Sequence, residues 1–392
     1  MRKVYVIGTM DTKAEELRFA ADCVRRAGAG VVLVDVGTKG GDFGADVSAV
    51  TIAGQAALGL TDRGVAVAGM ARALAAWLVA QPDIGAVLGL GGSGNTAIVT
   101  EAMRALPIGT PKLMVSTVAS GNVAPYIGPT DIAMMYSVVD VAGLNPISRR
   151  VIANAAHAAA GMALHEAPAA TAAEKPGIGM SMFGVTTACV TMVREALEET
   201  HECYVFHATG AGGQSMEKLA DSGLLGSLID VTTTEVADLL MGGVFPCTED
   251  RFGAVIRTRL PYVGSVGAVD MVNFGGRQTV PAHYADRNLY VHNPQVTLMR
   301  TTPEENRAIG AFIVERLNRM EGPVRFLLPL GGVSAIDVPG MPFHDPAADA
   351  ALFETIRARF MATPNRRLIE VQATINDRAF ADAILAAHRE IA

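Results

Sequence analysis

The sequence predicts an α/β protein built from two Rossmann-like, three-layer domains with mostly parallel sheets. Short apolar runs bounded by glycine, each followed by a segment with helical spacing, recur along both halves of the 392-residue chain. Between the halves, residues 167–176 are rich in Pro and Ala, a composition typical of a linker. We therefore expect one domain over residues 1–166 and another over residues 177–392, with their sheets facing each other across a cleft that hinges at the linker.

The composition argues against several classes of protein. The net charge is −7, with 32 Lys and Arg against 39 Asp and Glu, so no basic face for nucleic acid is expected. The four cysteines are scattered without a Cys-x-x-Cys pair, which favours a reduced, cytoplasmic protein over a disulfide-bonded or zinc-binding one. The first strand starts at Val4 with no signal peptide before it, and no uninterrupted apolar run reaches the ~18 residues of a membrane span.

The stretch from Ile84 to Met103 organises the N-terminal half. Ile84–Leu88 is typical of a strand buried on both faces, and the glycines after it let the backbone turn sharply and a ligand approach closely. A helix follows, and free N–H groups at a helix N-terminus attract anions. We therefore predict a loop that binds phosphate or carboxylate. The alternative is a tight strand–helix turn that binds nothing.

The glycine spacing of this loop only partly matches known nucleotide motifs. Gly89, Gly91 and Gly94 satisfy G-x-G-x-x-G, but a dinucleotide site also needs an acid about 20 residues further on, at the end of the next strand. That strand, residues 112–115, ends in Ser116 and Thr117 without an acid. No Gly-Lys-Ser or Gly-Lys-Thr follows the loop, so it is not a P-loop.

Two further loops are expected to face the same crevice. The first strand leads into residues 8–13, where Asp11 or Thr12 would be the N-cap of the next helix. The polar segment 116–131 is long for a loop inside a compact domain, which favours a functional role. The predicted cofactor-binding residues are Thr9, Asp11, Thr12, Lys13, Gly91, Gly92, Ser93, Gly94, Asn95, Thr96, Ser116, Thr117, Ser120 and Gly121.

The C-terminal half repeats this pattern. A strand starting at Ile178 leads into a helix as the first strand does, and residues 204–219 read as a strand, a glycine loop and a helix similar to residues 84–103. The strand at residues 228–231 then corresponds to the strand at residues 112–115. We predict that these loops, and a later glycine loop after a strand, bind a second substrate through Thr209, Gly210, Gly212, Gly213, Gly331 and Gly332.

Two helix starts are marked by local sequence. Asn145-Pro146 and Thr302-Pro303 each combine a good N-cap residue with proline at the first helical position, so helices are expected to begin there.

The side chains best suited to acid–base chemistry follow residue 280. His292 precedes Asn293 and Pro294 at the predicted end of a strand, where open α/β sheets meet their ligands. An imidazole there can transfer a proton or pair with a phosphate near neutral pH, although a core histidine bonded to the backbone is an equal alternative. The predicted catalytic residues are His292, Asp286 and Arg287. The spacing of the nearby acids and histidines matches no metal-binding motif, so no metal site is predicted.

Cys247 is expected to be a spectator thiol. It has no basic partner nearby in the sequence apart from Arg251, and a reactive cysteine needs a positive environment to form the thiolate.

Several motifs together resemble one known family. They are Val6-Ile7-Gly8-Thr9-Met10-Asp11-Thr12-Lys13, Gly91-Gly92-Ser93-Gly94, Met114-Val115-Ser116-Thr117, Asn154-Ala155-Ala156-His157, His207-Ala208-Thr209-Gly210, Val291-His292-Asn293-Pro294 and Pro329-Leu330-Gly331-Gly332-Val333-Ser334. Over essentially the whole chain, the sequence is similar to an uncharacterised bacterial and fungal family that includes the N-terminal region of the plant tomato mosaic virus resistance protein. The resemblance implies two α/β subdomains, ATP binding and a tendency to dimerise. In the plant protein a TIM-barrel domain follows, so any TIM-barrel partner of this chain would be a separate protein.

Two classes of function remain open at this point. The first is an ATP-using enzyme that acts on a small metabolite in the interdomain cleft. The second is a nucleotide-gated binding or regulatory module without turnover. A third interpretation, a nucleotide-sugar enzyme built on two Rossmann-like halves, would require a preference for a uridine nucleotide over ATP. We expect ATP as the cofactor, with a role for Mg²⁺ left open, and an unknown small molecule and a second copy of the chain as partners.

Overall fold

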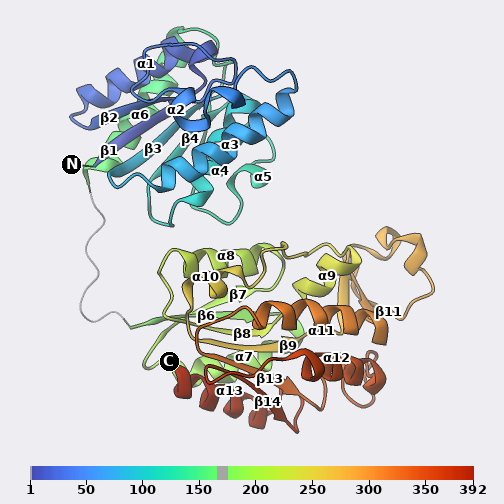
Figure 1. Cartoon of the computed structure of the whole chain (residues 1–392). Helices are drawn as coiled ribbons and strands as arrows, with labels where there is room; N and C mark the ends of the chain where they lie inside the picture. The colour runs from blue at the N-terminus through green and yellow to red at the C-terminus, as the bar shows by residue number, and fades with distance from the viewer. Residues whose placement is uncertain (1, 166–174) are drawn as a thin grey trace. The chain divides into compact units, whose positions relative to one another are not determined.

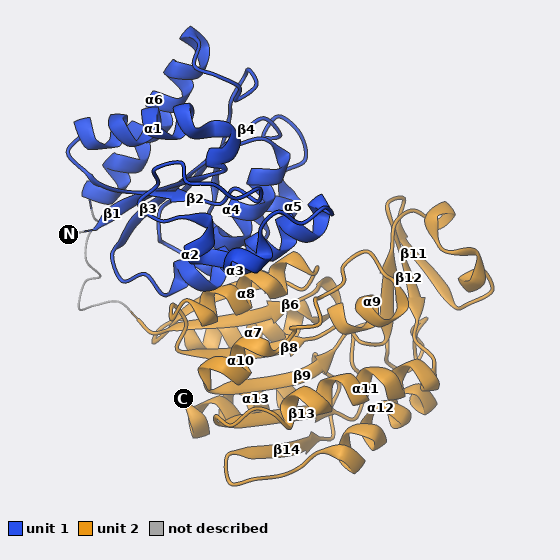
Figure 2. Cartoon of the chain, turned by 45° about the horizontal axis from the view of Figure 1, so that its top comes forward, with its two compact units in different colours: residues 1–170 blue, residues 171–392 orange. Residues whose placement is uncertain are grey.

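The computed structural model describes residues 2–165 and 175–392, and the chain forms two compact units (Figures 1 and 2). Unit 1 is residues 1–170 and unit 2 is residues 171–392. Of the predicted linker, residues 167–176, only Lys175 and Pro176 are among the described residues.

Unit 1 is built on a five-stranded parallel sheet. Its strands are β1 (Lys3–Gly8), β2 (Gly30–Asp35), β3 (Ile84–Gly91), β4 (Lys112–Ser116) and β5 (Ala133–Tyr136). They lie in the order β2-β1-β3-β4-β5, and each neighbouring pair is parallel. Successive side chains of a strand point to opposite faces, so Val4 and Val6 enter one core whereas Tyr5 and Ile7 enter the other.

Helices cover both faces of this sheet and make the unit a three-layer structure (Figure 1). One core contains side chains of α1 (Met10–Arg26) and α6 (Pro146–Leu164). The other contains side chains of α3 (Arg63–Val79) and α4 (Ser93–Ala105). Three short helical segments complete the unit, namely α2 (Ala49–Ala53), η1 (Gln55–Ala57) and α5 (Ala124–Ile127).

The predicted start of α1 is wrong by two residues or more. The N-cap is Thr9 rather than Asp11 or Thr12, and its side chain does not cap the helix. Instead, the Asp35 carboxylate accepts a hydrogen bond from the Met10 N–H at 2.9 Å. Because this cap comes from the end of β2, no local pattern in the sequence marks it. Asn145 and Thr302, by contrast, do cap their helices, each in a capping box.

Unit 2 has a six-stranded parallel sheet in the order β14-β13-β9-β8-β6-β7 and a three-stranded antiparallel sheet in the order β10-β12-β11. The parallel strands are β6 (Gly177–Met182), β7 (Glu202–His207), β8 (Ser227–Thr232), β9 (Tyr262–Gly267), β13 (Val324–Pro329) and β14 (Arg366–Val371). The antiparallel strands are β10 (Met271–Phe274), β11 (Leu289–Asn293) and β12 (Val296–Arg300). The α/β class with two mostly parallel sheets is therefore confirmed.

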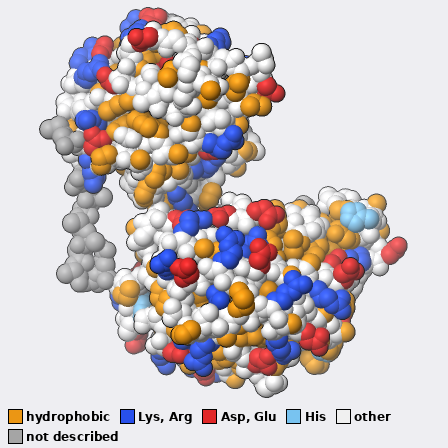
Figure 3. Space-filling view, viewed as in Figure 1, with side chains coloured by type: hydrophobic (Ala, Val, Ile, Leu, Met, Phe, Trp, Pro, Cys, Tyr) orange, Lys and Arg blue, Asp and Glu red, His pale blue; other side chains and the backbone are white. Residues whose placement is uncertain are grey.

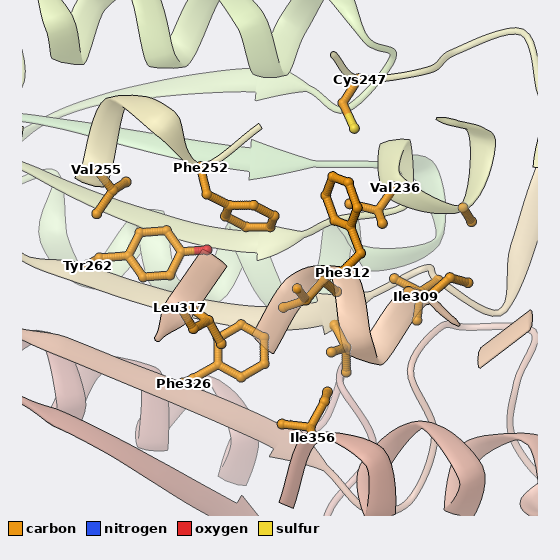
Figure 4. Close-up of a cluster of buried hydrophobic side chains, with 14 of the residues drawn as sticks. Val236, Cys247, Phe252, Val255, Tyr262, Ile309, Phe312, Leu317, Phe326 and Ile356 are labelled. Atoms are coloured by element: carbon orange, nitrogen blue, oxygen red, sulfur yellow. The ribbon is translucent and has the colours of Figure 1, made fainter. Parts of the chain in front are cut away.

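The helices of unit 2 also pack on both faces of its parallel sheet. One core contains side chains of α7 (Thr187–Leu197) and α13 (Arg378–Ile391). The larger core lies under α8 (Ala211–Asp221), α9 (Glu235–Met241), α10 (Gly253–Thr258), α11 (Pro303–Leu317) and α12 (Pro346–Arg359). Figure 4 shows this core, in which the rings of Phe252 and Tyr262 meet edge to face with centroids 6.4 Å apart. Short helical turns are η2 (Gly184–Thr186), η3 (Arg277–Thr279) and η4 (Ala282–Tyr284).

The two units share a strand order, but the correspondence differs from the predicted one. In unit 1 the first strand, β1, lies between β2 and β3; in unit 2 the first strand, β6, lies between β7 and β8. Strand β8 therefore corresponds to β3, whereas the sequence pattern paired β7 with β3. The glycines after β7 suggested that pairing, yet glycine content does not determine the position of a strand in a sheet.

Charged side chains of both signs are interspersed over the face of unit 2 seen in Figure 3. Some form exposed ion pairs, such as Arg257 with Asp221 at 2.7 Å. Among the helices of the described ranges, none is both long enough and apolar enough to span a bilayer.

Candidate functional site

A pocket of about 640 Å³ opens in unit 1 where β1 and β3 end. The chain leaves β1 towards β2 on one side, and β3 lies on the other side of β1, so the loops after these strands diverge. Such a topological switch point is where open α/β sheets bind ligands. Of the predicted cofactor-binding residues, those that line the pocket are Thr9, Asp11, Thr12, Lys13, Gly92, Ser93, Gly94 and Asn95.

The loop after β3 presents unused backbone donors to this pocket. Gly92 is the N-cap of α4 and provides no side chain, and the first helical hydrogen bond runs from the Thr96 N–H to the Gly92 carbonyl. Within the described part of the chain, no acceptor faces the N–H groups of Ser93, Gly94 and Asn95. Three neighbouring donors at the positive end of a helix are suited to an anion.

The glycines of this loop serve different purposes. Gly91 has φ +156°, and a Cβ there would lie 2.8 Å from Asn95 Cβ, so this position needs glycine for the turn itself. Gly92 has φ −88°, and a Cβ there would meet only Thr117 Oγ1, at 3.6 Å. Since the fold does not require glycine at residue 92, its missing side chain leaves room on the pocket side.

Three cationic side chains line the pocket, and none of them forms an ion pair with any described residue: Lys13, Lys39 and Arg63. Arg63 is the first residue of α3, and its Nη2 lies 3.4 Å from where a Cβ on Gly94 would be. A guanidinium beside the N-termini of two helices is electrostatically unfavourable unless an anion is present.

Two of these cations were missed by the sequence analysis. Lys39 belongs to the loop after β2, and the carboxyl ends of parallel strands meet at one edge, so its proximity could have been expected. Arg63 follows a loop that does not begin at a strand, and no local signal marks it. The exposed Asp140 also lines the pocket.

Several predicted cofactor residues support the loop and are not among the residues that line the pocket. The buried Thr96 hydroxyl contacts the Gly92 carbonyl at 2.9 Å and the Ser116 hydroxyl at 2.6 Å. The Thr117 N–H donates to the Gly91 carbonyl at 3.2 Å. Ser120 and Gly121 are exposed residues further along the same segment.

Asn95 is buried beneath the loop and holds it in place. Its side-chain Nδ2 donates to the Leu90 carbonyl, which fixes the orientation of the amide because a carbonyl can only accept. Asn95 Oδ1 is buried with no hydrogen-bond partner in the described structure.

The glycine loop of unit 2 is occupied by the chain itself. The N–H groups of Gly210 and Gly213 donate to Glu235 Oε1 at 2.7 and 3.1 Å. A Cβ on Gly213 would lie 2.1 Å from Glu235 Oε2, and one on Gly212 would lie 1.9 Å from the His207 carbonyl oxygen. Thr209 Oγ1 donates to the same His207 carbonyl at 3.3 Å. These glycines therefore allow close internal packing, and the predicted substrate site has no free N–H at Gly210 or Gly213.

Glu235 belongs to a buried ionic cluster around Arg251. The guanidinium contacts Glu235 Oε2 at 3.0 Å, Glu217 Oε1 at 2.9 Å and the Asp230 carboxylate at 2.9 Å. Burial alone would lower the pKa of Arg251, but the three carboxylates outweigh it and hold the pKa well above its ordinary value. Burial raises the pKa of Glu217 and Glu235, and Arg251 opposes that rise. The spacing of these residues follows no motif, so the sequence analysis did not find them.

Gly331 and Gly332 also lie at close backbone approaches. A Cβ on Gly331 would lie 2.9 Å from the carbonyl carbon of Ala373, and one on Gly332 would lie 2.1 Å from the Asp337 carbonyl oxygen. Gly332 has φ +136°. The structure thus explains both glycines by packing.

The predicted position of His292 is wrong. His292 is an exposed residue of β11, which belongs to the antiparallel sheet and not to the parallel one. The tip of the β11–β12 hairpin follows at once, where the Gln295 N–H donates to Asn293 Oδ1 at 2.8 Å. The sequence signal, a strand ending at Asn293-Pro294, was real, but it marks a hairpin.

The other two predicted catalytic residues differ in their surroundings. Arg287 donates to both carboxylate oxygens of Glu305, at 2.8 and 2.7 Å, and this hydrogen bonding raises the pKa of Arg287. It also donates to the Arg300 carbonyl at 2.8 Å, which is typical of a structural clamp. Asp286 is exposed.

Cys247 is buried, and burial raises the pKa of its thiol to about 12, so the thiolate needed for reactivity is disfavoured. Among the residues that the structure describes, no three His, Cys, Asp or Glu side chains gather into a group that could hold a metal.

Comparison with known proteins assigns the chain to a family. Residues 2–168 match the model of the N-terminal domain of the uncharacterised protein family UPF0261, and residues 175–392 match its C-terminal domain. The chain is 55% identical to a UPF0261 protein of Rhizobium meliloti, with 100% of each chain covered. It is 44% identical to a UPF0261 protein of Clostridium tetani, covering 98% of this chain and 97% of the other. It is 42% identical to the ToMV resistance protein Tm-1(GCR237) of Solanum lycopersicum, covering 99% of this chain and 56% of that protein. The chain therefore belongs to the UPF0261 family.

Proposed function

We propose that unit 1 binds ATP, with the phosphates on the loop Gly91–Thr96. The observation that carries the proposal is the N-terminus of α4, which turns the unused N–H groups of Ser93, Gly94 and Asn95 towards a pocket of about 640 Å³. That volume falls in the range of small-molecule sites and is large enough for a nucleotide.

The charges around the pocket support the same proposal. Lys13, Lys39 and Arg63 line it, and each lacks an ion-pair partner among the described residues. Arg63 is the first residue of α3 and lies beside the start of α4, so the dipoles of these helices repel it by about 0.3–1 kcal/mol for each unfavourable interaction. A polyphosphate would turn this repulsion into attraction.

We further propose that ATP serves an enzymatic reaction on a small metabolite. One observation favours the alternative, a nucleotide-gated binding or regulatory module: the glycine loop expected to hold a second substrate is already bonded to Glu235. Consumption of ATP that depends on an added metabolite would support the enzyme. Tight ATP binding without hydrolysis would support the module. Mass spectrometry of ligands retained on the purified protein would identify the metabolite to test.

The experiment that tests ATP binding is the substitution Gly92→Val, followed by calorimetric titration with ATP. The backbone at residue 92 is extended, with φ −88° and ψ −167°, which a β-branched residue adopts readily. The new side chain should exclude phosphate and weaken ATP binding by about 100-fold or more, because several charge-assisted hydrogen bonds are lost.

Gly161→Val in α6 is the matched control, because a Cβ at Gly161 meets nothing within 4 Å and this residue does not line the pocket. It should bind ATP as the wild type does. Equal ATP affinity of Gly92→Val and Gly161→Val would overturn the proposal.

We extend the proposal to the assembly: a homodimer in the cytoplasm that cooperates with a separate TIM-barrel protein. The chain covers 56% of the length of the tomato protein that it resembles. Sedimentation of the purified chain tests the dimer.

A further inference from the structure

Two residues that line the pocket, Asp11 and Asn95, each have a buried oxygen without a hydrogen-bond partner in the described ranges, and that of Asp11 belongs to a carboxylate. Asp11, the second residue of α1, lines the pocket, and its Oδ1 is buried without a hydrogen-bond partner in the described ranges. A buried acceptor is normally paired, so an unpaired one at the wall of a pocket points to a donor supplied by the ligand.

The neighbouring acid, Asp35, already accepts hydrogen bonds from the backbone. Asp35 Oδ1 accepts from the N–H groups of Met10 and Gly37, at 2.9 and 2.8 Å. A Cβ on Gly37 would lie 3.0 Å from Asp11 Cγ and 3.1 Å from Asp35 Oδ1, so the two carboxylates flank the same glycine. In dinucleotide-binding folds, an acid at the end of the second strand accepts from a ribose hydroxyl. Here that acid caps α1, and Asp11 stands beside it with an unused oxygen.

The other polar groups of this loop do not compete for the same ligand donor. The Thr9 and Thr12 hydroxyls contact each other at 3.1 Å, and Thr12 Oγ1 also reaches the Thr9 carbonyl at 3.3 Å. The nearby Lys13 forms no ion pair with Asp11 in the described structure. Asp11 is therefore the carboxylate that this loop offers to the pocket.

Asp11 and the N-terminus of α4 lie on different sides of the pocket. Asp11 and Asp35 lie on the β2 side of β1, whereas the N-terminus of α4 and Arg63 lie on the β3 side. A ligand with an anionic end and a hydroxyl-bearing end fits this arrangement in one orientation, with the anion at α4 and the hydroxyl at Asp11.

We propose that Asp11 accepts a hydrogen bond from a sugar hydroxyl, so that the pocket selects ribonucleotides over nucleotides that lack both the 2′- and 3′-hydroxyls. This inference rests on the proposed ATP binding and adds the specificity-determining residue. The Asp11 side chain binds the sugar and the α4 loop binds the phosphates.

Calorimetric titration of the wild type, Asp11→Ala and Asp11→Asn with ATP and with 2′,3′-dideoxy-ATP tests the inference. The wild type should bind ATP about 10- to 100-fold more tightly than the dideoxy analogue, the range expected for a hydrogen bond to a charged acceptor. In Asp11→Ala this preference should fall to within about twofold, mainly because ATP binds more weakly. Asp11→Asn, which keeps an acceptor without charge, should lie between the two. Asp140→Asn, which removes an equal charge elsewhere on the lining, should keep the wild-type preference.

Three outcomes separate the possible failures. Absence of ATP binding by the wild type would overturn the proposed function and the inference with it. Binding of ATP with no preference over the dideoxy analogue, or an equal loss for both nucleotides in Asp11→Ala, would overturn the inference alone. A preference that disappears when EDTA removes Mg²⁺ would also overturn it, because Asp11 would then bind the metal rather than the sugar.

Discussion

The two glycine loops of this chain look alike in sequence and differ in what faces their helix N-terminus. In unit 1 the N–H groups at the start of α4 turn towards a pocket, which is also lined by cations that form no ion pair with the described residues. In unit 2 the N–H groups at the start of α8 donate to the carboxylate of Glu235. The same local geometry therefore binds an internal carboxylate in unit 2, whereas in unit 1 its N–H groups have no acceptor among the described residues.

The difference extends to the switch point of each sheet. The place in unit 2 that corresponds to the pocket of unit 1 lies at the ends of β6 and β8. There the hydroxyls of Thr186 and Thr232 contact each other at 2.8 Å, and the Ala335 N–H donates to the Val185 carbonyl at 2.9 Å. Residues of unit 2 thus hydrogen-bond to one another at this place. A shared strand order alone therefore does not predict a binding site.

The largest effect is expected from removing Arg251, the cation that pairs with Glu235. Arg251→Ala leaves Glu217, Asp230 and Glu235 buried together without their counter-ion, so we expect unit 2 to lose about 3–5 kcal/mol of stability. Urea unfolding followed by circular dichroism measures the loss. Fluorescence of Trp77, the one tryptophan of the chain, reports on unit 1 during the same titration.

The control for Arg251→Ala is Arg257→Ala, which removes a half-exposed arginine from α10 that pairs with Asp221 and Asp250. Its cost should stay below about 1 kcal/mol, as for other exposed ion pairs. Similar losses for the two variants would show that the buried cluster is not what holds the loop of unit 2 closed.

The stability of unit 2 is expected to depend on pH through two buried carboxyl groups. In unit 2, burial raises the pKa of Asp337 and Asp349 to about 7 each, with repulsion from Asp270 adding to the rise for Asp337 and repulsion from Asp337 adding to it for Asp349. Arg300 donates to both, at 3.2 and 2.8 Å. The folded state therefore holds protons that the unfolded chain releases near the ordinary carboxyl value of 3.8. This stabilisation is complete below that value and is lost as the pH rises through about 7.

Asp349→Asn tests this pH dependence, because an amide mimics the neutral carboxyl and does not titrate. Between pH 5 and 7 the free energy of unfolding of the wild type should fall relative to that of Asp349→Asn. The difference should be up to about 1.4 kcal/mol per pH unit for each proton that the folded wild type retains and the variant does not. Asp382→Asn, at an exposed carboxylate paired with Arg378, should follow the wild type. If the Asp349→Asn and wild-type curves run parallel over this range, Asp349 holds no proton that matters for folding.

Much of the fold was readable from the sequence because its signals are local. The apolar runs located several of the parallel strands, among them β1, β3 and β4, and Asn145-Pro146 and Thr302-Pro303 located two helix starts. The loops after β1 and β3 were expected to meet because adjacent parallel strands end at one edge, and both line the pocket.

The missed features depend on contacts between residues far apart in the chain. Asp35 caps α1 from 25 residues away, and Glu235 fills the loop at Gly210 from the same sequence separation. No spacing rule connects such residues. Strand order was also misjudged, because a pattern of strand, glycine and helix is the same wherever the strand lies in the sheet.

Substitution of His292, which lies outside both glycine loops, is expected to have the smallest effect on stability and on ATP affinity. It is exposed on β11, at a register shift between Val291 and Asn293, and a bulge of this kind can present a side chain for function. His292→Gln should change the stability of the chain by less than about 0.5 kcal/mol, because an exposed side chain is replaced by another polar one. ATP affinity should stay within twofold of the wild type, since His292 does not line the pocket. Urea unfolding and calorimetric titration measure these two quantities.

Should a metabolite-dependent reaction be found, a general acid–base role predicts a fall in turnover of about 100-fold in this variant at unchanged ATP affinity. Full turnover would exclude that role for His292, and a large loss of ATP affinity would mean that nucleotide binding extends beyond the pocket of unit 1.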